Sequence, residues 1–309
     1  MKILMIGLGK MGANMTRRLA QHDIEVIGFD KAAPARASIS STKNVTVADS
    51  LQNALEQLPL PHIVWSMLPA GTVSQSTFDT LLPLLSPGDI VIDGANAHYK
   101  DTLRRAAQFA ERKVNLVDAG VSGGIWGLKL GYGLMVGGDA QAVRSVEPLL
   151  SALAPPAASK ADKTWVHCGD TGSGHYTKMI HNGIEYGLMQ AYAEGIALLK
   201  EKSEFSLDVA AIAESWRHGT VIRSWLLDLT AEFLKRDASL TDVMPHVADS
   251  GEGRWTALEA IELGVPAPVI GAALNVRFGS QGRGDYTDKL LAQMRAGFGG
   301  HAVERSSSE

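Results

Sequence analysis

The sequence predicts an α/β protein, in which an N-terminal doubly wound and mainly parallel sheet precedes a separate all-helical domain. Up to about residue 170, short apolar runs alternate with helical patterns, which is typical of a parallel sheet with helices on both faces. Beyond that point only helical patterns remain. We therefore predict a sheet domain at residues 1–170 and a helical domain at residues 171–309.

Composition excludes several classes of protein. A chain of 309 residues with 45% hydrophobic and 20% charged residues is typical of a soluble globular protein with two cores. The net charge of −4 gives no reason to expect nucleic acid or an acidic membrane as a partner. With Cys168 as its single cysteine and no cluster at metal-ligand spacing, we expect no disulfide and no metal. The apolar N-terminus is soon broken by glycines, so we expect no signal peptide and a cytoplasmic location.

The first element is an apolar strand, Lys2–Ile6, and an amphipathic helix ends near Gln21. In a strand–turn–helix unit, glycines permit a tight turn, close approach to a pyrophosphate and close helix packing. The helix N-terminus adds a partial positive charge, so the pattern predicts dinucleotide binding in a Rossmann-type domain, although a tight turn without a ligand is the alternative. The turn between strand and helix consists of Gly7, Leu8, Gly9, Lys10, Met11 and Gly12.

The second strand begins at Glu25 and ends at Asp30, about 20 residues after the glycines. An acid at this position can accept a hydrogen bond from a ribose 2′-hydroxyl and would repel a 2′-phosphate, which favours NAD. Lys31 and Arg36 lie close by and could accept that phosphate, so NADP stays an alternative cofactor. Asp30 could also be a turn or cap residue.

Later strands and helices alternate regularly. The expected strands are 44–47, 62–67, 89–93, 114–118, 131–136 and 164–167. The expected helices between them are 50–58, 73–84, 99–111 and 140–153.

Ligands of such sheets bind at the carboxyl ends of the strands, where two polar stretches are expected. Leu68, Pro69 and Ala70 follow one strand and are expected near the dinucleotide. Asn96 follows another and is expected to face the nicotinamide or the substrate, although by itself it reads as a turn or a helix cap before Tyr99.

A second glycine-rich loop is expected to run from Asp118 to Gly124. Its serine and bare backbone N–H groups suit an anion or a row of hydroxyls. A plain flexible loop is the alternative. The candidate ligand-binding residues here are Ser122, Gly123 and Gly124.

A long helix is expected from about residue 172 to about residue 202, and its first turns carry an unusual polar face. An α-helix turns by about 100° per residue, so the direction of each side chain around the helix axis can be compared with that of Lys178. On this scale His181 lies at about −60°, Asn182 at about +40°, Glu185 at about −20° and Tyr186 at about +80°. A solvated stripe is usually Glu, Lys and Arg, whereas this face mixes five chemistries. We interpret it as a catalytic face at the junction of the two domains, with a solvated surface helix as the alternative.

Further helices are expected at 208–217, 221–235, 255–263, 266–278 and 286–296, and residues after His301 are expected to be disordered. Arg277 and Arg295 suit bidentate phosphate binding, although isolated arginines more often form surface ion pairs.

Together these patterns resemble the 6-phosphogluconate dehydrogenases, the decarboxylating enzymes of the pentose phosphate pathway. The motifs run from end to end of the chain in the family's order, and the length is similar to the family's short form. The helix motif is highly specific, whereas the first glycine motif is not. The motifs are Gly7–Gly12, Asp93–Asn96, Val121–Gly124, Lys178–Tyr186, Gly187–Gln190, Gly253–Thr256 and Phe298–His301.

The resemblance implies a reaction that oxidises 6-phosphogluconate with NAD and releases CO2 and ribulose 5-phosphate without a metal. It implies that Lys178 is the general base and Glu185 the general acid. Contacts to the carboxylate and hydroxyls of the sugar acid are implied for Asn96, Ser122, Gly123, Gly124, His181 and Asn182. Phosphate contacts are implied for Tyr186, Arg277 and Arg295.

In the family, the C-terminal tail completes the site of a partner subunit. The resemblance therefore implies that His301 reaches a neighbour's site and that the chain forms a homodimer or homotetramer. The helical domain is expected to bind substrate and to dimerise.

The chain departs from the long form of the family at two places. The long form usually has an Asn-Arg-Thr type sequence after the second strand and uses NADP, whereas Asp30 and Lys31 here support NAD. Where the long form has a lysine and a threonine that contact phosphate, this chain has Ser250 and Glu252. Another phosphorylated or unphosphorylated sugar acid therefore stays open as substrate.

Two rival functions remain at this stage. A β-hydroxyacid dehydrogenase of the 3-hydroxyisobutyrate type has the same architecture and a lysine on the same helix, but it does not need Glu185, Tyr186 or the basic tail. A dinucleotide-binding regulator without turnover would leave the polar helix face unexplained.

Overall fold

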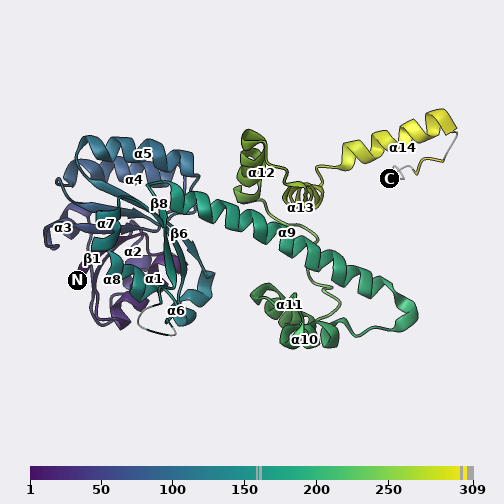
Figure 1. The fold of residues 1–309 in the computed structure, drawn as a ribbon, viewed down its shortest axis with the longest axis horizontal. Coiled ribbons are helices and arrows are strands. Elements are labelled where there is room, and N and C mark those ends of the chain that lie inside the picture. The colour runs from purple at the N-terminus through teal and green to yellow at the C-terminus, as the bar shows by residue number, and fades with distance from the viewer. Residues whose placement is uncertain (158, 160–161, 300–301, 305–309) are drawn as a thin grey trace. The chain divides into compact units, whose positions relative to one another are not determined.

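The structure is a computed structural model that describes residues 1–157, 159, 162–299 and 302–304. Contacts between residues divide the chain into two compact units, Met1–Met179 and Ile180–Glu309. One long helix, α9 (Ser173–Glu201), contributes to both (Figure 1). Within the described residues, every helix is too short or too polar to cross a lipid bilayer.

The first unit is built on one sheet with the strand order β3-β2-β1-β4-β5-β6-β7-β8. Every neighbouring pair is parallel except β6 and β7, which are antiparallel. This order, with strands on both sides of β1, confirms the predicted doubly wound sheet. The strands are β1 (Lys2–Ile6), β2 (Glu25–Phe29), β3 (Val45–Val47), β4 (Ile63–Ser66), β5 (Ile90–Asp93), β6 (Asn115–Ser122), β7 (Gly133–Gly137) and β8 (Trp165–Gly169).

Helices cover both faces of this sheet (Figure 1). Ile3 and Met5 of β1 belong to the core that contains side chains of α1, α7 and α8, whereas Leu4 and Ile6 belong to the core formed with α3, α4 and α5. Because successive strand residues point to opposite faces, one apolar strand supplies both cores. The helices are α1 (Lys10–Gln21), α2 (Ala33–Ala37), α3 (Leu51–Glu56), α4 (Thr72–Leu81), α5 (Tyr99–Glu111), α6 (Gly127–Leu130), α7 (Ala140–Ser145) and α8 (Glu147–Leu153).

The second unit is helical, as predicted, in the residues that the structure describes. Helices α10 and α11 share a small core around Ala213, Leu227 and Ala231. A separate cluster joins Tyr186 of α9 to Ala273 and Leu274 of α13. The helices after α9 are α10 (Val209–Gly219), α11 (Trp225–Arg236), α12 (Glu252–Leu263), α13 (Pro268–Gly279) and α14 (Asp285–Gly299).

Among the expected elements that differ from the structure, three differences have a clear local cause. The stretch expected as a loop from residue 118 is strand as far as Ser122, because it pairs with β7. The helix expected at 140–153 is broken at Val146, and Pro148 lies in the first turn of the helix that follows. The helix expected from residue 221 begins at Trp225, where the hydroxyl of Ser224 accepts a hydrogen bond from the Leu227 N–H.

A buried ion pair fixes the end of β5, next to the stretch that contains Asn96. Arg105 Nη1 lies 2.9 Å from Asp93 Oδ2, and both side chains are at most 1% exposed. The other oxygen of Asp93 accepts a hydrogen bond from the Ala95 N–H at 3.1 Å. The pair therefore links α5 to the turn that follows the strand.

We expect Arg105→Met to lower the free energy of unfolding by about 3 kcal/mol, because it leaves the Asp93 carboxylate buried without its cation. The matched control is Arg104→Met, which removes an arginine that is 59% exposed and pairs with Asp101 on the same helix. This control should cost less than about 1 kcal/mol. If denaturant titrations gave the same loss of unfolding free energy for the two variants, the buried ion pair would contribute no more to stability than the exposed one.

Candidate functional site

The glycine turn between β1 and α1 has the geometry that a dinucleotide site requires. Gly7 has a φ of +88° and donates its N–H to the Phe29 carbonyl at 2.9 Å. A Cβ on Gly12 would lie 1.9 Å from the Gly7 carbonyl oxygen, so only glycine lets the helix start so close to the strand. A Cβ on Gly9 would meet nothing within 4 Å, so the space beside the helix N-terminus is open.

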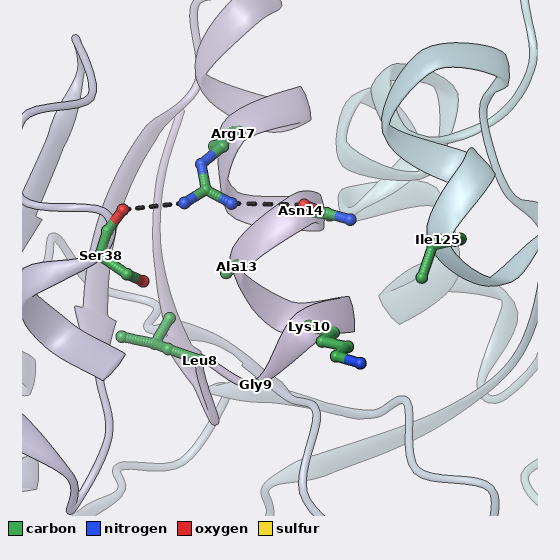
Figure 2. Close-up of a pocket in the computed structure, with 8 residues that line it drawn as sticks. All are labelled: Leu8, Gly9, Lys10, Ala13, Asn14, Arg17, Ser38 and Ile125. Atoms are coloured by element: carbon green, nitrogen blue, oxygen red, sulfur yellow. Dashed lines mark hydrogen bonds between the residues drawn. The ribbon is translucent and has the colours of Figure 1, made fainter. Parts of the chain in front are cut away.

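A pocket of about 330 Å³ lies beside this turn (Figure 2). Lys10 extends from the start of α1, and Ile125 faces the helix from a different segment. Arg17 donates hydrogen bonds to the Ser38 carbonyl at 2.8 Å and to Asn14 Oδ1 at 3.3 Å. A helix N-terminus with a lysine and no acid in its first turn suits a pyrophosphate. The pocket is lined by Leu8, Gly9, Lys10, Ala13, Asn14, Arg17, Ser38 and Ile125.

Asp30 follows β2 and links two backbone segments. Its Oδ2 accepts a hydrogen bond from the Leu8 N–H, and its Oδ1 accepts one from the Ala32 N–H, both at 2.8 Å. Arg36 donates to the carbonyls of Asp30 and Lys31 at 2.6 and 3.2 Å. Asp30 thus has the turn role that we set as its alternative. Each carboxylate oxygen retains a lone pair that could accept from a ribose hydroxyl.

The stretches after β4 and β5 lie at the same edge of the sheet. Leu68 packs against the second core, whereas Pro69 and Ala70 are exposed. Asn96 is exposed as well, and the residue that caps α5 is His98, whose ring accepts a hydrogen bond from the Lys100 N–H. The interpretation of Asn96 as a helix cap is therefore wrong.

The strand β6 ends beside Ser122, and two glycines in unusual conformations follow. Gly123 has a φ of +124° and Gly124 a φ of +51°. The next two side chains, Ile125 and Trp126, are largely exposed although both are apolar. This segment borders the pocket beside α1 through Ile125.

Lys178 lies in the second turn of α9 and rests on the backbone of β6. A Cβ on Gly120 would lie 2.4 Å from the Lys178 Cβ and 3.1 Å from its Cγ. The lysine stem therefore occupies the space that the glycine leaves. Because Gly120 precedes Ser122 by two residues, the lysine and the serine are positioned by one strand.

Further along α9, three polar side chains of the predicted face lie close together. His181 Nδ1 lies 3.2 Å from Asn182 Oδ1 and 3.9 Å from Glu185 Oε2. The histidine and glutamate side chains are each 41% exposed. An imidazole, an amide and a carboxyl group are thus grouped on the helix.

Tyr186 is buried, and the Arg277 guanidinium lies 3.6 Å from the centroid of its ring. Arg277 also donates to the Ala248 carbonyl at 3.0 Å. A guanidinium held over an aromatic ring is a common cation–π arrangement. Tyr186 and Arg277, which were both predicted to contact phosphate, are therefore neighbours.

Ser250 and Glu252, which stand where the long form has a lysine and a threonine, contact each other. Ser250 Oγ donates to Glu252 Oε2 at 2.6 Å, and Tyr186 Oη lies 3.3 Å from the same serine oxygen. Glu252 is only 4% exposed. The glutamate is thus turned inward and bonded to the serine, beside the phenol of Tyr186.

The last two predicted site residues, Arg295 and His301, belong to the C-terminal part of the chain. Arg295 is an exposed residue of α14, and His301 lies outside the described residues, as do 305–309 of the tail that was expected to be disordered. Sequence reasoning missed Arg17 and Ser38, which line the pocket, and Asp118 of β6, which accepts a hydrogen bond from the His175 N–H of α9 at 2.7 Å. For Asp118 the sequence offered one indication, which is that an aspartate follows an apolar run.

Comparison with known families shows to which family the chain belongs. Residues 2–169 match the family model described as the NAD binding domain of 6-phosphogluconate dehydrogenase, and residues 174–293 match its C-terminal domain. The chain belongs to the 6-phosphogluconate dehydrogenase family. It is similar over its full length to the family's short form.

Relatives span several organisms. An NAD(+)-dependent, decarboxylating 6-phosphogluconate dehydrogenase of Haloferax volcanii is 40% identical over 99% of this chain and 99% of its own. The YqeC protein of Bacillus subtilis is 40% identical over 99% of this chain and 100% of its own. A Staphylococcus aureus decarboxylating 6-phosphogluconate dehydrogenase is 36% identical over 90% of this chain but only 61% of its own, so it is longer.

Solved structures agree with this assignment. The Plasmodium falciparum 6-phosphogluconate dehydrogenase has a TM-score of 0.83 at 28% identity, covering 100% of this chain and 67% of that chain. A Mycobacterium tuberculosis 3-hydroxyisobutyrate dehydrogenase has a TM-score of 0.71 at 23% identity, covering 89% of this chain and 92% of that chain. The second likeness shows a shared fold alone.

Proposed function

We propose that this chain catalyses the oxidative decarboxylation of 6-phospho-D-gluconate to D-ribulose 5-phosphate and CO2, with NAD as the preferred oxidant. The observation that carries the proposal is the polar face of α9, which begins with Lys178 on Gly120 and continues to Glu185. Residues seven apart on an α-helix differ in direction by about 20°, so an amine and a carboxyl project from one side of α9. The Haloferax volcanii relative with this activity matches the whole chain.

The proposed cofactor site is the turn between β1 and α1. The N–H groups of Gly9, Lys10 and Met11 are proposed to bind the pyrophosphate, with Asp30 at the adenosine ribose and residues 68–70 beside the nucleotide. Bound NAD supplies the hydride acceptor. The open space at Gly9 and the closely packed Gly12 support this assignment.

Lys178 is proposed to act as a neutral amine. It accepts the proton of the substrate's C3 hydroxyl while C3 loses its hydride, which leaves a 3-keto acid. The resulting ammonium donates to the new carbonyl oxygen while the C1–C2 bond breaks and CO2 leaves. The electron pair of that bond forms an enediol, and the lysine proton moves to its oxygen.

Glu185 is proposed to act in its protonated form. It donates its proton to the carbon that lost CO2, while Lys178 takes back the enediol proton, and the ketone product results. Proton return from Lys178 to Glu185 restores the enzyme, so no proton is gained or lost overall. Metal ions have no place in this scheme.

The remaining contacts are proposed from their chemistry. His181, Asn182, Asn96 and the segment 122–124 are proposed to bind the carboxylate and hydroxyls of the substrate. Tyr186, Arg277 and Arg295 are proposed to bind its phosphate. His301 is proposed to reach the site of a partner subunit, so that a homodimer or homotetramer is the active form.

Steady-state NADH formation from 6-phosphogluconate, unphosphorylated gluconate and 3-hydroxyisobutyrate tests the substrate. The proposal expects turnover with 6-phosphogluconate and at least about tenfold lower kcat/KM for gluconate, which lacks the group that Arg277 would bind. Preferred turnover of 3-hydroxyisobutyrate would identify the rival dehydrogenase. Nucleotide binding without turnover of any of the three acids would favour a regulator.

Asp30→Ala is expected to lower kcat/KM for NAD by about tenfold or more, since a hydrogen bond to a charged group is lost. Activity with NADP should fall less or rise, because the repulsion of a 2′-phosphate is removed. The ratio of the two kcat/KM values is the measurement, because general damage to the turn cancels in it. The exposed Asp49 provides a control, Asp49→Ala, that should keep the wild-type ratio. An unchanged ratio in Asp30→Ala would refute this basis for cofactor choice.

A further inference from the structure

The start of α9 is held by a carboxylate from the middle of β6. Asp118 is fully buried, and its two oxygens accept hydrogen bonds from the N–H groups of Gly172 and His175, the second at 2.7 Å. These donors are among the N–H groups that the first turn of a helix leaves without a backbone partner. A buried aspartate at this position is stabilised by two N–H donors and by the positive end of the helix dipole.

The surrounding backbone leaves this helix end very little room. A Cβ on Gly174 would lie 2.5 Å from the Met135 carbonyl oxygen and 2.6 Å from that of Asp118. A Cβ on Gly137 would lie 2.5 Å from Asp118 Oδ1. The first turn of α9 is therefore packed directly on the backbones of β6 and β7.

Two more hydrogen bonds fix the same segment. Thr171 Oγ1 donates to the Leu116 carbonyl at 2.9 Å, and Thr102 Oγ1 of α5 lies 2.7 Å from His175 Nδ1. Lys178 follows His175 by three residues, which is less than one turn. Any rotation or shift of the first turn therefore moves the lysine by a similar amount.

We propose that Asp118 is a positioning residue for Lys178. It fixes the rotation and height of the first turn of α9, so that the lysine stem stays against Gly120. The amine is then held at a set distance from Ser122–Gly124, because both groups depend on β6. This inference rests on the proposed function, in which Lys178 is the base, and adds a residue that touches neither substrate nor cofactor.

The test compares Asp118 with Asp139, an exposed aspartate that caps a helix through one of its oxygens. Asp139 accepts hydrogen bonds from the N–H groups of Gln141 and Ala142 at the start of α7, and these bonds hold the pKa of Asp139 below its usual value. Asp118→Asn replaces one acceptor oxygen by an NH2 group that faces a backbone N–H. Asp139→Asn removes the same charge from the start of a helix without a proposed catalytic residue, while the oxygen that accepts both hydrogen bonds is retained.

We expect Asp118→Asn to lower kcat by about 10- to 100-fold, the scale that a displacement of about 1 Å causes. The KM for 6-phosphogluconate and the Kd for NAD from a direct titration should change by less than about threefold, since the groups that bind them are unchanged. The acid limb of the kcat–pH profile should move to higher pH, because a lysine released from its place is better solvated and holds its proton more tightly. Asp139→Asn should keep the wild-type kcat and profile.

Gly120→Ala provides a second approach if Asp118→Asn fails to fold. It keeps the aspartate but places a methyl group where the Lys178 stem lies, and it should produce the same lower kcat and shifted profile. The positioning role is overturned if Asp118→Asn folds and retains the wild-type kcat and pH profile, or if Gly120→Ala does so where Asp118→Asn does not fold. It is also overturned if Asp118→Asn and Asp139→Asn lose activity equally. Full activity of Lys178→Ala would instead overturn the proposed function, whatever the aspartate variants show.

Discussion

Lys178→Ala is expected to lower kcat for 6-phosphogluconate by about 10³- to 10⁴-fold. General base catalysis contributes up to about 10⁴-fold, and the same amine is proposed to polarise the keto intermediate. The Kd for NAD, measured by direct titration, should stay within about twofold of the wild-type value, because the turn of residues 7–12 is unchanged. The loss should appear in single-turnover NADH formation as well, since hydride leaves C3 only as the hydroxyl proton is taken.

Lys200→Ala is the matched control for this variant. Lys200 lies in the last turn of α9, and its Nζ is 3.4 Å from the Ala238 carbonyl oxygen. The control removes an amine from the same helix and should leave kcat within about twofold of wild type, as is usual for surface substitutions. If the two variants were equally active, Lys178 could not be the base.

Glu185→Gln is expected to lower kcat by about 10²- to 10³-fold through a different step. Glutamine keeps the shape of the side chain but has no carboxylic proton to donate to the enediol carbon. A first-turnover burst of NADH should therefore remain, whereas release of ribulose 5-phosphate should become slow. Loss of the burst together with kcat would place Glu185 before the protonation step and contradict its proposed role.

Glu194→Gln is the control on the same helix. Glu194 is exposed and accepts a hydrogen bond from Gln190 at 2.8 Å. The first-turnover burst of NADH and the release of ribulose 5-phosphate should both run at the wild-type rate in this variant. A slow protonation step in both variants would show that the effect belongs to the charge of α9 rather than to one carboxyl group.

Local patterns predicted the elements that depend on nearby residues. The unit β1–turn–α1 could be predicted because Gly7, Gly9 and Gly12 each satisfy a need of that turn itself. The polar face of α9 could be predicted because helical spacing alone puts its side chains together. The break near Val146 could have been found as well, since Pro148 favours a helix start over a helix interior.

Distant contacts determined what the sequence did not reveal. β6 continues to Ser122 because β7 pairs with it, and residues 118–122 alone look like a small-residue loop. Asp118 meets Gly172, which is 54 residues away, so no local pattern shows that it caps α9.

The coupling between oxidation and CO2 release can be followed directly with 6-phosphogluconate labelled with carbon-13 at C1. NADH is counted by its absorbance and labelled CO2 by mass spectrometry in the same reaction. If Lys178 and Glu185 have the roles proposed for them, one labelled CO2 is expected for each NADH, and ribulose 5-phosphate is formed in equal amount. NADH formed while the label stays in the sugar acid would contradict the decarboxylating mechanism and leave a simple hydroxyacid dehydrogenase.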